Sequence, residues 1–372
     1  MRVLLISTSY PRTAGDWRGI FILHQAAALA RADGVALQIW APPGDLPDKV
    51  QAVTTPAESA WLGALMEAGG ISHLMRGGGA KAWFAPLRLL RYLRAAYRRR
   101  NDVDVYHINW LQSALPLPGN GKPALITVLG NDLKLLRLPF MRALLRRVMR
   151  GRAVAICPNA DWMVAPLREA FGDLATIDPV SFGIDPRWYA IERAPPANAP
   201  ARWLAVTRLT QDKLGPLFEW SEALFRDGTR ELHLFGPMQE GVSVPPWVHY
   251  HGPATPTQLA EEWFPQACGL ITLSRHAEGR PQVMLESMAA GLPIVASRMP
   301  AHASLVIDGD TGRLVGSQDD YINAVHETEQ ADTNRRFGVA ARSKMRVEVG
   351  TWDDCAGRYI RLYRQLQDRP RG

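Results

Sequence analysis

The sequence predicts an α/β protein made of two doubly wound domains, each with a parallel sheet covered by helices on both faces. Apolar, β-rich runs alternate with helical stretches along the chain, which is typical of such sheets. The length of 372 residues, with 47% hydrophobic and 21% charged residues, suits two soluble globular domains. The expected strands are "VLLIS", "VALQIWA", "DVYHIN", "ALITVLG" and "AVAICP", followed by "WLAVTRL", "ELHLFGP", "VHYHG", "GLITLS" and "PIVAS".

The first strand is expected at residues 3–7. The stretch "MRVLLISTSYPR" favours this strand over a signal peptide, because its apolar run is short and soon interrupted. No run approaches the ~20 apolar residues that a membrane-spanning helix needs. Cys157, Cys268 and Cys355 lie far apart without a Cys-x-x-Cys pair, so neither a zinc site nor a disulfide framework is suggested. These features favour a reducing cytoplasm.

The boundary between the domains is expected in "ERAPPANAPAR", residues 192–202, where prolines and alanines break any periodic pattern. Residues 1–190 are then expected to form the first domain, and residues 200–350 the second.

Charge divides along the same line. Up to Gly183 the chain has 22 Lys and Arg against 13 Asp and Glu, a balance of +9, which leaves −2 for the remainder of the net +7. The positive charge is concentrated in residues 88–100 and 134–150, where leucines and aromatic residues alternate with arginines at helical spacing. Such helices bind anionic lipid headgroups, and a solvated helix face is the alternative. Nucleic acid is not an expected partner, because no known binding module is present.

Polar residues end two strands of the first domain. "DVYHINW" places His107, Asn109 and Trp110 at a strand end, and "ITVLGNDL" does the same for Asn131 and Asp132. The carboxyl ends of such strands form the binding crevice of an open α/β sheet. His107 could equally be a buried, hydrogen-bonded histidine, and Trp110 a packing residue. A glycine loop with Gly15 and Gly19 also follows the first strand and leads into a helix. Such a loop suits phosphate, although it lacks the full G-x-G-x-x-G pattern of dinucleotide sites, and a simple tight turn is the alternative.

In "AEGRPQVMLESMAAGLPIVAS", two glutamates border the start of one helix. Pro281 suits the first turn and Gly291 suits the residue after the last turn, so the helix is expected at about residues 281–290. Glu286 points back along the helix toward the loop that carries Glu278. Unpaired N–H groups at this helix start favour anions, and the carboxylates suit sugar hydroxyls.

A cationic pair precedes that helix in the chain. In "VTRLTQDKLG", Arg208 ends a predicted strand and Lys213 follows in the next loop. An arginine fork and a lysine point charge can converge on a diphosphate.

Together these motifs resemble the GT-B glycosyltransferases, in particular the retaining group called family 4, or glycosyl transferases group 1. The resemblance covers nearly the whole chain and is strongest from "WLAVTRLTQDKLG" through "FGP" and "YHGP" to "SRHAEGRPQVMLESMAAGLPIVAS" and "DGDTGRLV". It implies two Rossmann-like domains facing a cleft, a hexosyltransferase activity of class EC 2.4, and retention at the anomeric carbon. It also implies that a C-terminal helix, at about residues 352–372, returns to the first domain.

The resemblance also implies roles for individual residues. Glu286 would bind the ribose hydroxyls, Glu278 the donor sugar, and Arg208 with Lys213 the diphosphate, without a metal. One departure is Leu129, which stands where many relatives have a histidine, so no role can be carried over there. "DVD" at residues 102–104 opens a strand and is expected to be structural rather than metal-binding. The expected catalytic residues are Glu278, Arg208, Lys213 and His107; the donor-binding residues are Gly19, Arg208, Lys213, Glu278, Gly279, Arg280, Pro281, Gln282 and Glu286; the acceptor-binding residues are Asn109, Trp110, Asn131 and Asp132.

The leading hypothesis is therefore a retaining glycosyltransferase of cell-surface polysaccharide biosynthesis. It would move a sugar from a UDP- or GDP-sugar to a glycan or lipid-linked acceptor at the cytoplasmic face of the membrane. The alternatives are a transferase with a soluble small acceptor, a nucleotide-sugar 2-epimerase, and a non-catalytic nucleotide-sugar-binding partner.

Overall fold

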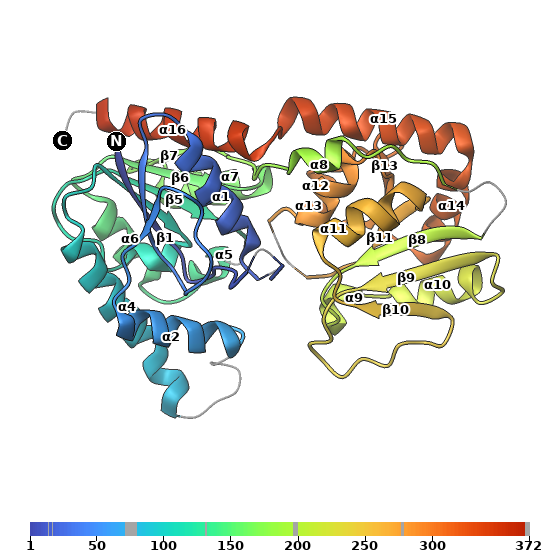
Figure 1. Cartoon of the computed structure of the whole chain (residues 1–372), viewed down its shortest axis with the longest axis horizontal. Coiled ribbons are helices and arrows are strands. Elements are labelled where there is room, and N and C mark those ends of the chain that lie inside the picture. The colour runs from blue at the N-terminus through green and yellow to red at the C-terminus, as the bar shows by residue number, and fades with distance from the viewer. Residues whose placement is uncertain are drawn as a thin grey trace. The chain divides into compact units, whose positions relative to one another are not determined.

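The computed structural model describes residues 1–368 except residues 14, 17, 71–79, 131, 196–199, 277 and 278, and only the backbone of residues 80–83. The chain forms two compact units (Figure 1). The first comprises Met1–Gly183 and the C-terminal segment from Trp352, and the second comprises Ile184–Thr351.

The second unit begins earlier in the chain than the expected boundary. The Ile184 N–H donates to the Gly350 carbonyl at 3.1 Å, and Trp188 is buried in the core of the second unit. Residues 184–190 therefore belong to the second unit and not to the first, because their apolar side chains are buried there.

The first unit is built on a seven-stranded parallel sheet with the order β3-β2-β1-β4-β5-β6-β7. Its chain runs outward from β1 in one direction and then resumes at β4 in the other, as in a doubly wound fold. The strands are β1 Arg2–Ile6, β2 Ala36–Trp40, β3 Val50–Ala52, β4 Val105–Asn109, β5 Ala124–Val128, β6 Val154–Pro158 and β7 Thr176–Ile177.

Both faces of this sheet are buried, because successive side chains of a strand point to opposite faces. Leu4 and Ile6 of β1 join a core with α2, α4, α6 and α7, whereas Val3 and Leu5 join a core with α1 and α16. The helices are α1 Ile20–Arg31, α2 Pro56–Glu67, α4 Ala80–Arg99, α5 Asp132–Leu135, α6 Met141–Met149, α7 Val164–Phe171 and α16 Trp352–Asp368, with 3₁₀ turns at Leu111–Ala114 and Asp161–Met163.

Helix α16 comes from the far end of the chain and lies against α1 (Figure 1). It contributes Tyr359 and Tyr363, which are fully buried against the sheet. Tyr363 Oη shares a hydrogen bond of 2.5 Å with His107 Nδ1 on β4, and His107 Nε2 lies 2.9 Å from Thr127 Oγ1 on β5. The C-terminal helix thus completes the hydrogen bonding of a buried polar group in the first sheet.

The second unit repeats this architecture with a six-stranded parallel sheet in the order β10-β9-β8-β11-β12-β13. Its core on one face includes α8, α12 and α15, and its core on the other face includes α10 and α14. The strands are β8 Ala201–Val206, β9 Arg230–Phe235, β10 Val248–Gly252, β11 Gly269–Thr272, β12 Ile294–Ser297 and β13 Gly312–Val315. The helices are α8 Pro186–Tyr189, α9 Gln211–Leu214, α10 Leu217–Phe225, α11 Pro256–Gln258, α12 Gln282–Ala289, α13 Pro300–Ala303, α14 Gln318–Glu329 and α15 Ala331–Glu348, with short π and 3₁₀ segments at Leu259–Trp263 and Phe264–Gln266.

The predicted fold class of two doubly wound α/β domains is confirmed. Each of the ten predicted runs forms a strand, and the structure adds the short strands β3, β7 and β13. Among the described residues, no helix combines the length and apolar character needed to cross a bilayer.

We expect Tyr363→Phe to destabilise the protein by about 1–3 kcal/mol, because it leaves His107 Nδ1 without its partner in the core. Urea unfolding of the variant measures this change. Tyr92→Phe is the control, since the Tyr92 hydroxyl accepts from the exposed Arg88 and from no other residue that the structure describes. Equal unfolding midpoints for the two variants would contradict the expectation.

Candidate functional site

The candidate site lies at the carboxyl edge of the second sheet. The strand order reverses between β8 and β11, which are neighbours in the sheet. Ligands of open α/β sheets bind outside the carboxyl ends of the strands at such a reversal. The loop after β8 carries Arg208 and Lys213, and the loop after β11 leads into α12.

Backbone contacts bring the loops at this edge together. The Leu209 N–H donates to the Pro237 carbonyl at 2.9 Å, so the segment after β8 pairs with the loop after β9. Gly236 has a φ of 137°, and a Cβ added there would lie 1.7 Å from the Thr207 carbonyl oxygen. Only glycine permits this close approach.

A second set of contacts joins α9 to the loop after β11. The Arg275 N–H donates to the Asp212 carbonyl at 2.8 Å, and Ser297 Oγ at the end of β12 donates to the Ser274 carbonyl at 2.7 Å. The ends of β8, β11 and β12 are therefore held together. Lys213 lies beside them in α9, the short helix after β8.

Arg208 and Lys213 are both partly exposed at this edge. Thr210 Oγ1 accepts from the Lys213 N–H at 3.3 Å and so caps α9. Arg208 forms no ion pair with any residue that the structure describes. Its guanidinium is thus available for an anion that binds at the edge.

Helix α12 begins at this edge, close to the predicted bounds. Pro281 is its N-cap residue, one position before the expected first turn, and Gly291 follows the C-cap with a φ of 69°. Gly279 is buried, whereas Arg280, Pro281 and Gln282 are partly exposed. The N-cap side chain makes no hydrogen bond to the first turn, and the positive end of the helix dipole at this turn suits an anion.

Glu286 lies one turn into α12 and keeps part of its surface exposed. Desolvation by the surrounding protein raises the pKa of Glu286 from 4.5 to about 8, and the negative charge of Asp185 adds to this effect. The hydrogen bond from Gln282 and the positive charge of Arg187 act in the opposite direction. At neutral pH the carboxyl is therefore largely protonated, and it can donate as well as accept a hydrogen bond.

Two predicted site residues, Glu278 and Asn131, lie outside the described residues. Their roles remain predictions.

In the first unit, Gly19 is the N-cap of α1 and has a φ of 72°. A Cβ there would lie 2.4 Å from Ser9 Oγ, so the loop after β1 folds tightly onto the start of α1. Gly19 is at the carboxyl edge of the first sheet, beside the reversal between β1 and β4.

The structure favours the interpretation of His107 as a buried, hydrogen-bonded histidine. The side chain is fully buried, and desolvation lowers its pKa to about 3, so it stays neutral at physiological pH. Both ring nitrogens have partners inside the first unit. The predicted catalytic role of His107 thus finds no support, because its ring is engaged in the core.

Asn109 and Asp132 are also buried, and both hold backbone groups. Asn109 Nδ2 donates to the Ile6 carbonyl. The Asp132 oxygens accept from the N–H groups of Leu111 and Leu129 at 2.9 and 2.8 Å, and desolvation raises the pKa of Asp132 to about 6. Asp132 therefore ties two loops together, and both of its oxygens accept backbone hydrogen bonds.

Among the predicted acceptor residues that the structure describes, Trp110 keeps an accessible surface. It is partly exposed, its φ is 69°, and its ring lies edge-on to that of Phe21. A positive φ at a bulky residue is strained and persists where the surroundings fix it.

Asp102 and Asp104 of the "DVD" segment contact Arg2, and Asp104 Oδ2 also accepts from the Arg2 N–H at 2.7 Å. No cluster of three or more His, Cys, Asp or Glu side chains suited to a metal occurs in the described part of the chain.

The sequence did not reveal the residues that hold the far end of α12. Arg193 Nη1 donates to the Gly291 carbonyl at 2.6 Å. Arg342 donates to the carbonyls of Ala289 and Ala290 at 3.0 and 2.6 Å. Both arginines are remote from α12 in the chain, and no local pattern marks them.

We expect ionisation of Glu286 to destabilise the folded protein, because its folded pKa lies above the ordinary value. The folded state then binds more protons than the unfolded state, so this contribution decreases as the pH rises from about 4.5 through about 8. Glu286→Gln removes it, and the stability difference from wild type changes by about 3 kcal/mol between pH 5 and 8. Urea unfolding at both pH values measures it.

Glu262→Gln, a change at an exposed glutamate of the same unit, is the control for general charge effects. If Glu286→Gln and wild type lose stability in parallel across this range, the desolvated carboxyl is not the cause.

Known proteins resemble this chain in sequence and in fold. Residues 217–329 match the model of the family described as Glycosyl transferases group 1. A D-inositol 3-phosphate glycosyltransferase from Corynebacterium urealyticum is 26% identical over 135 residues, which are 36% of this chain and 31% of the relative. The match therefore spans about a third of that relative's length.

Solved structures share the fold over the whole chain. Sucrose-phosphate synthase from Thermosynechococcus elongatus has a TM-score of 0.71 at 19% identity and covers 98% of both chains. Anabaena HepE, solved in complex with UDP and glucose, has a TM-score of 0.65 at 14% identity and covers 98% of this chain and 100% of its own. The chain thus resembles glycosyl transferases group 1 in part of its second unit, and it shares the GT-B fold of these solved structures across both units.

Proposed function

We propose that this protein is a retaining glycosyltransferase that moves a sugar from a nucleoside diphosphate sugar to a glycan or lipid-linked acceptor. The observation that carries the proposal is the edge of the second sheet, where Arg208, Lys213 and the start of α12 come together. The family match includes α12, and the fold is shared with a protein solved with UDP.

The chemistry follows from the charge that develops when the anomeric bond breaks. The nucleoside diphosphate leaves as an anion, and cations placed beforehand stabilise it in the transition state. Arg208 and Lys213, with the positive end of the α12 dipole, would supply this stabilisation, so a metal is not required in the proposal. Glu286 would bind the ribose hydroxyls and Glu278 the donor sugar.

A soluble acceptor is the second candidate. The Corynebacterium relative is named for D-inositol 3-phosphate, so an inositol phosphate is a reasonable acceptor to test beside glycans and lipid-linked sugars.

The lipid-linked acceptor gains support from exposed apolar side chains in the first unit. Phe84 and Leu87 are exposed on α4 beside Arg88 and Arg91. Near α6, Leu138, Phe140 and Leu144 are exposed, and Phe140 is 81% exposed with a φ of 61°. Apolar side chains beside arginines suit the surface of an anionic bilayer.

The donor proposal predicts that one nucleotide family among UDP, GDP and ADP raises the stability of the folded protein. At a ligand concentration of 100 Kd the gain is about 2.7 kcal/mol, and thermal unfolding measures it. Glu286→Ala abolishes the gain, whereas Glu262→Ala retains it. Incubation of the donor with candidate acceptors, followed by NMR of the anomeric proton, then tests transfer with retention.

The proposal fails if no nucleotide stabilises the protein, or if Glu286→Ala responds as wild type does. Nucleotide binding without sugar transfer to any acceptor would favour the non-catalytic alternative.

The membrane proposal predicts that the protein binds vesicles containing phosphatidylglycerol and not vesicles of phosphatidylcholine alone. Phe140→Ser weakens the binding roughly tenfold or more, because insertion of an aromatic side chain contributes about 1.5–3 kcal/mol. Co-sedimentation with vesicles measures the effect. Val347→Ser is the control, since Val347 is 83% exposed on α15. Equal binding of both variants, or no binding to anionic vesicles, would contradict membrane contact through this region.

A further inference from the structure

The second unit contains a cavity of about 870 Å³ away from the candidate donor site. Ala201 opens β8, Cys268 directly precedes β11, and Gly291 lies shortly before β12, so the cavity is at the amino ends of the parallel strands. Arg208 and Lys213 lie at the opposite edge of the same sheet. The volume is in the range of small-molecule sites.

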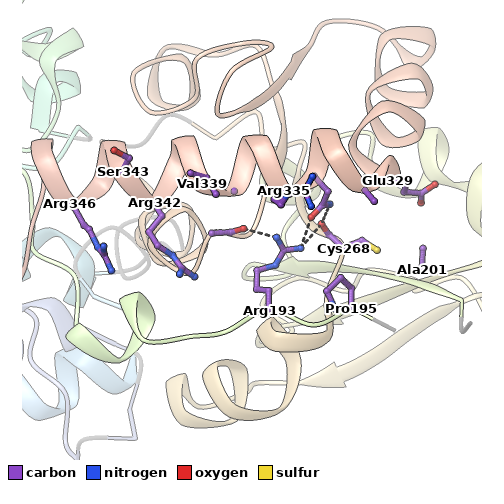
Figure 2. A pocket seen from close by; sticks show the side chains of 14 residues that line it. Arg193, Pro195, Ala201, Cys268, Glu329, Arg335, Val339, Arg342, Ser343 and Arg346 are labelled. Carbon is purple, nitrogen blue, oxygen red and sulfur yellow. Dashed lines mark hydrogen bonds between the residues drawn. The ribbon is translucent and has the colours of Figure 1, made fainter. Parts of the chain in front are cut away.

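One wall of the cavity is a face of α15. Arg335, Val339, Arg342 and Arg346 follow one another at intervals of three or four residues, and Figure 2 shows them along the helix. Such spacing places side chains on one face. Because a helix rises about 1.5 Å per residue, the arginines span about 16 Å along this wall.

The charge of the cavity is strongly positive. Its lining includes four arginines, at positions 193, 335, 342 and 346, and one acidic residue, Glu329. The Glu329 carboxylate is already bonded to Arg230 at 2.8 Å and to Trp203 Nε1 at 2.9 Å. Glu329 therefore does little to neutralise the arginines.

Two of the arginines at the helical wall are available at the surface. Arg335 pairs with Asp332, whose side chain is 92% exposed, and exposed pairs of this kind contribute little. Arg346 lies over the ring of Tyr189 and has no ion-pair partner in the described part of the chain. A ligand can engage both without breaking a buried interaction.

Arg193 also lines the cavity, and its guanidinium reaches up to α15 (Figure 2). Its Nη atoms donate to the carbonyls of Gly291 and Ala267 and to Asn334 Oδ1. Its Nε atom is buried and has no hydrogen-bond partner among the described residues. Protein groups therefore fix the Arg193 guanidinium in the cavity lining.

We propose that this cavity binds a small ligand bearing more than one phosphate group. The arginine fork matches phosphate oxygens, and several arginines spread along α15 suit phosphates that are separated along the ligand. The proposal does not depend on the proposed transferase function, because the donor site is at the other edge of the sheet. The cavity also adjoins Arg193 and Arg342, which hold the last carbonyls of α12, so its ligand contacts the support of the donor-binding helix.

Cys268 provides a local reporter for occupancy. It lines the cavity and is partly exposed, whereas Cys157 and Cys355 are buried. In the folded protein, iodoacetamide should therefore modify one thiol, and a neutral reagent does not itself compete for the arginines. Burial raises the pKa of the Cys268 thiol, so the reaction is followed at mildly alkaline pH by mass spectrometry.

Pyrophosphate is the probe, with chloride adjusted to keep the ionic strength constant. We expect it to slow modification of Cys268 about tenfold at ten times its Kd. The variant Arg335→Gln/Arg346→Gln loses this protection, and its exposed positions favour retention of the fold. Arg226→Gln, at the exposed C-cap residue of α10 in the same unit, keeps it. In Arg208→Gln the protection also persists, which separates this cavity from the donor site.

The proposal is overturned if pyrophosphate leaves the Cys268 rate unchanged. It is also overturned if protection is equal in Arg335→Gln/Arg346→Gln and wild type, or is lost in Arg226→Gln, since either result means a non-specific ionic effect. Protection lost only in Arg208→Gln would assign the pyrophosphate to the donor site and would likewise overturn it.

Discussion

Parallel strands that are apolar on both sides must be covered on both faces, and this requirement organises the chain. In the first unit, α1 and α16 cover one face, and α16 is supplied by the last described residues. In the second unit, α12 and α15 lie in the core of one face, and α10 and α14 in the core of the other. Because α12 covers that face, its first turn, which precedes Glu286, lies at the carboxyl edge of the sheet.

The chemistry of the candidate site depends on that placement. Helix α12 starts among loops that are fixed to one another by backbone hydrogen bonds, so its first N–H groups have a defined direction. The C-terminal end of α12 is held by Arg193 and Arg342, whose positive charges stabilise the negative end of the helix dipole. The protein around Glu286 desolvates its carboxyl group and so raises its pKa.

Apolar runs in the sequence predicted ten of the strands, and Pro281 with Gly291 predicted the bounds of α12 to within one residue. The strands β3 and β7 escaped because they have three and two residues, too few for a period. The sequence could not decide whether His107 is a site residue or a buried one, since its partner Tyr363 is 256 positions away. Asp132 likewise resembled a ligand at a strand end, and only the fold shows that its oxygens hold Leu111 and Leu129. Such long-range pairings arise from tertiary structure and leave no local signal.

The discontinuous first unit has a consequence for synthesis of the protein. A chain emerges from the ribosome from its N-terminus, and domains generally fold as units as they appear. Here the strands of the first sheet appear first, and all of Ile184–Thr351 must follow before α16 can dock. During that interval the apolar face beneath α16 is uncovered, and His107 lacks Tyr363. The whole sequence of the second unit is thus available before that of the first unit. The sheet of the first unit is synthesised earlier, but it is fully covered later, when α16 docks.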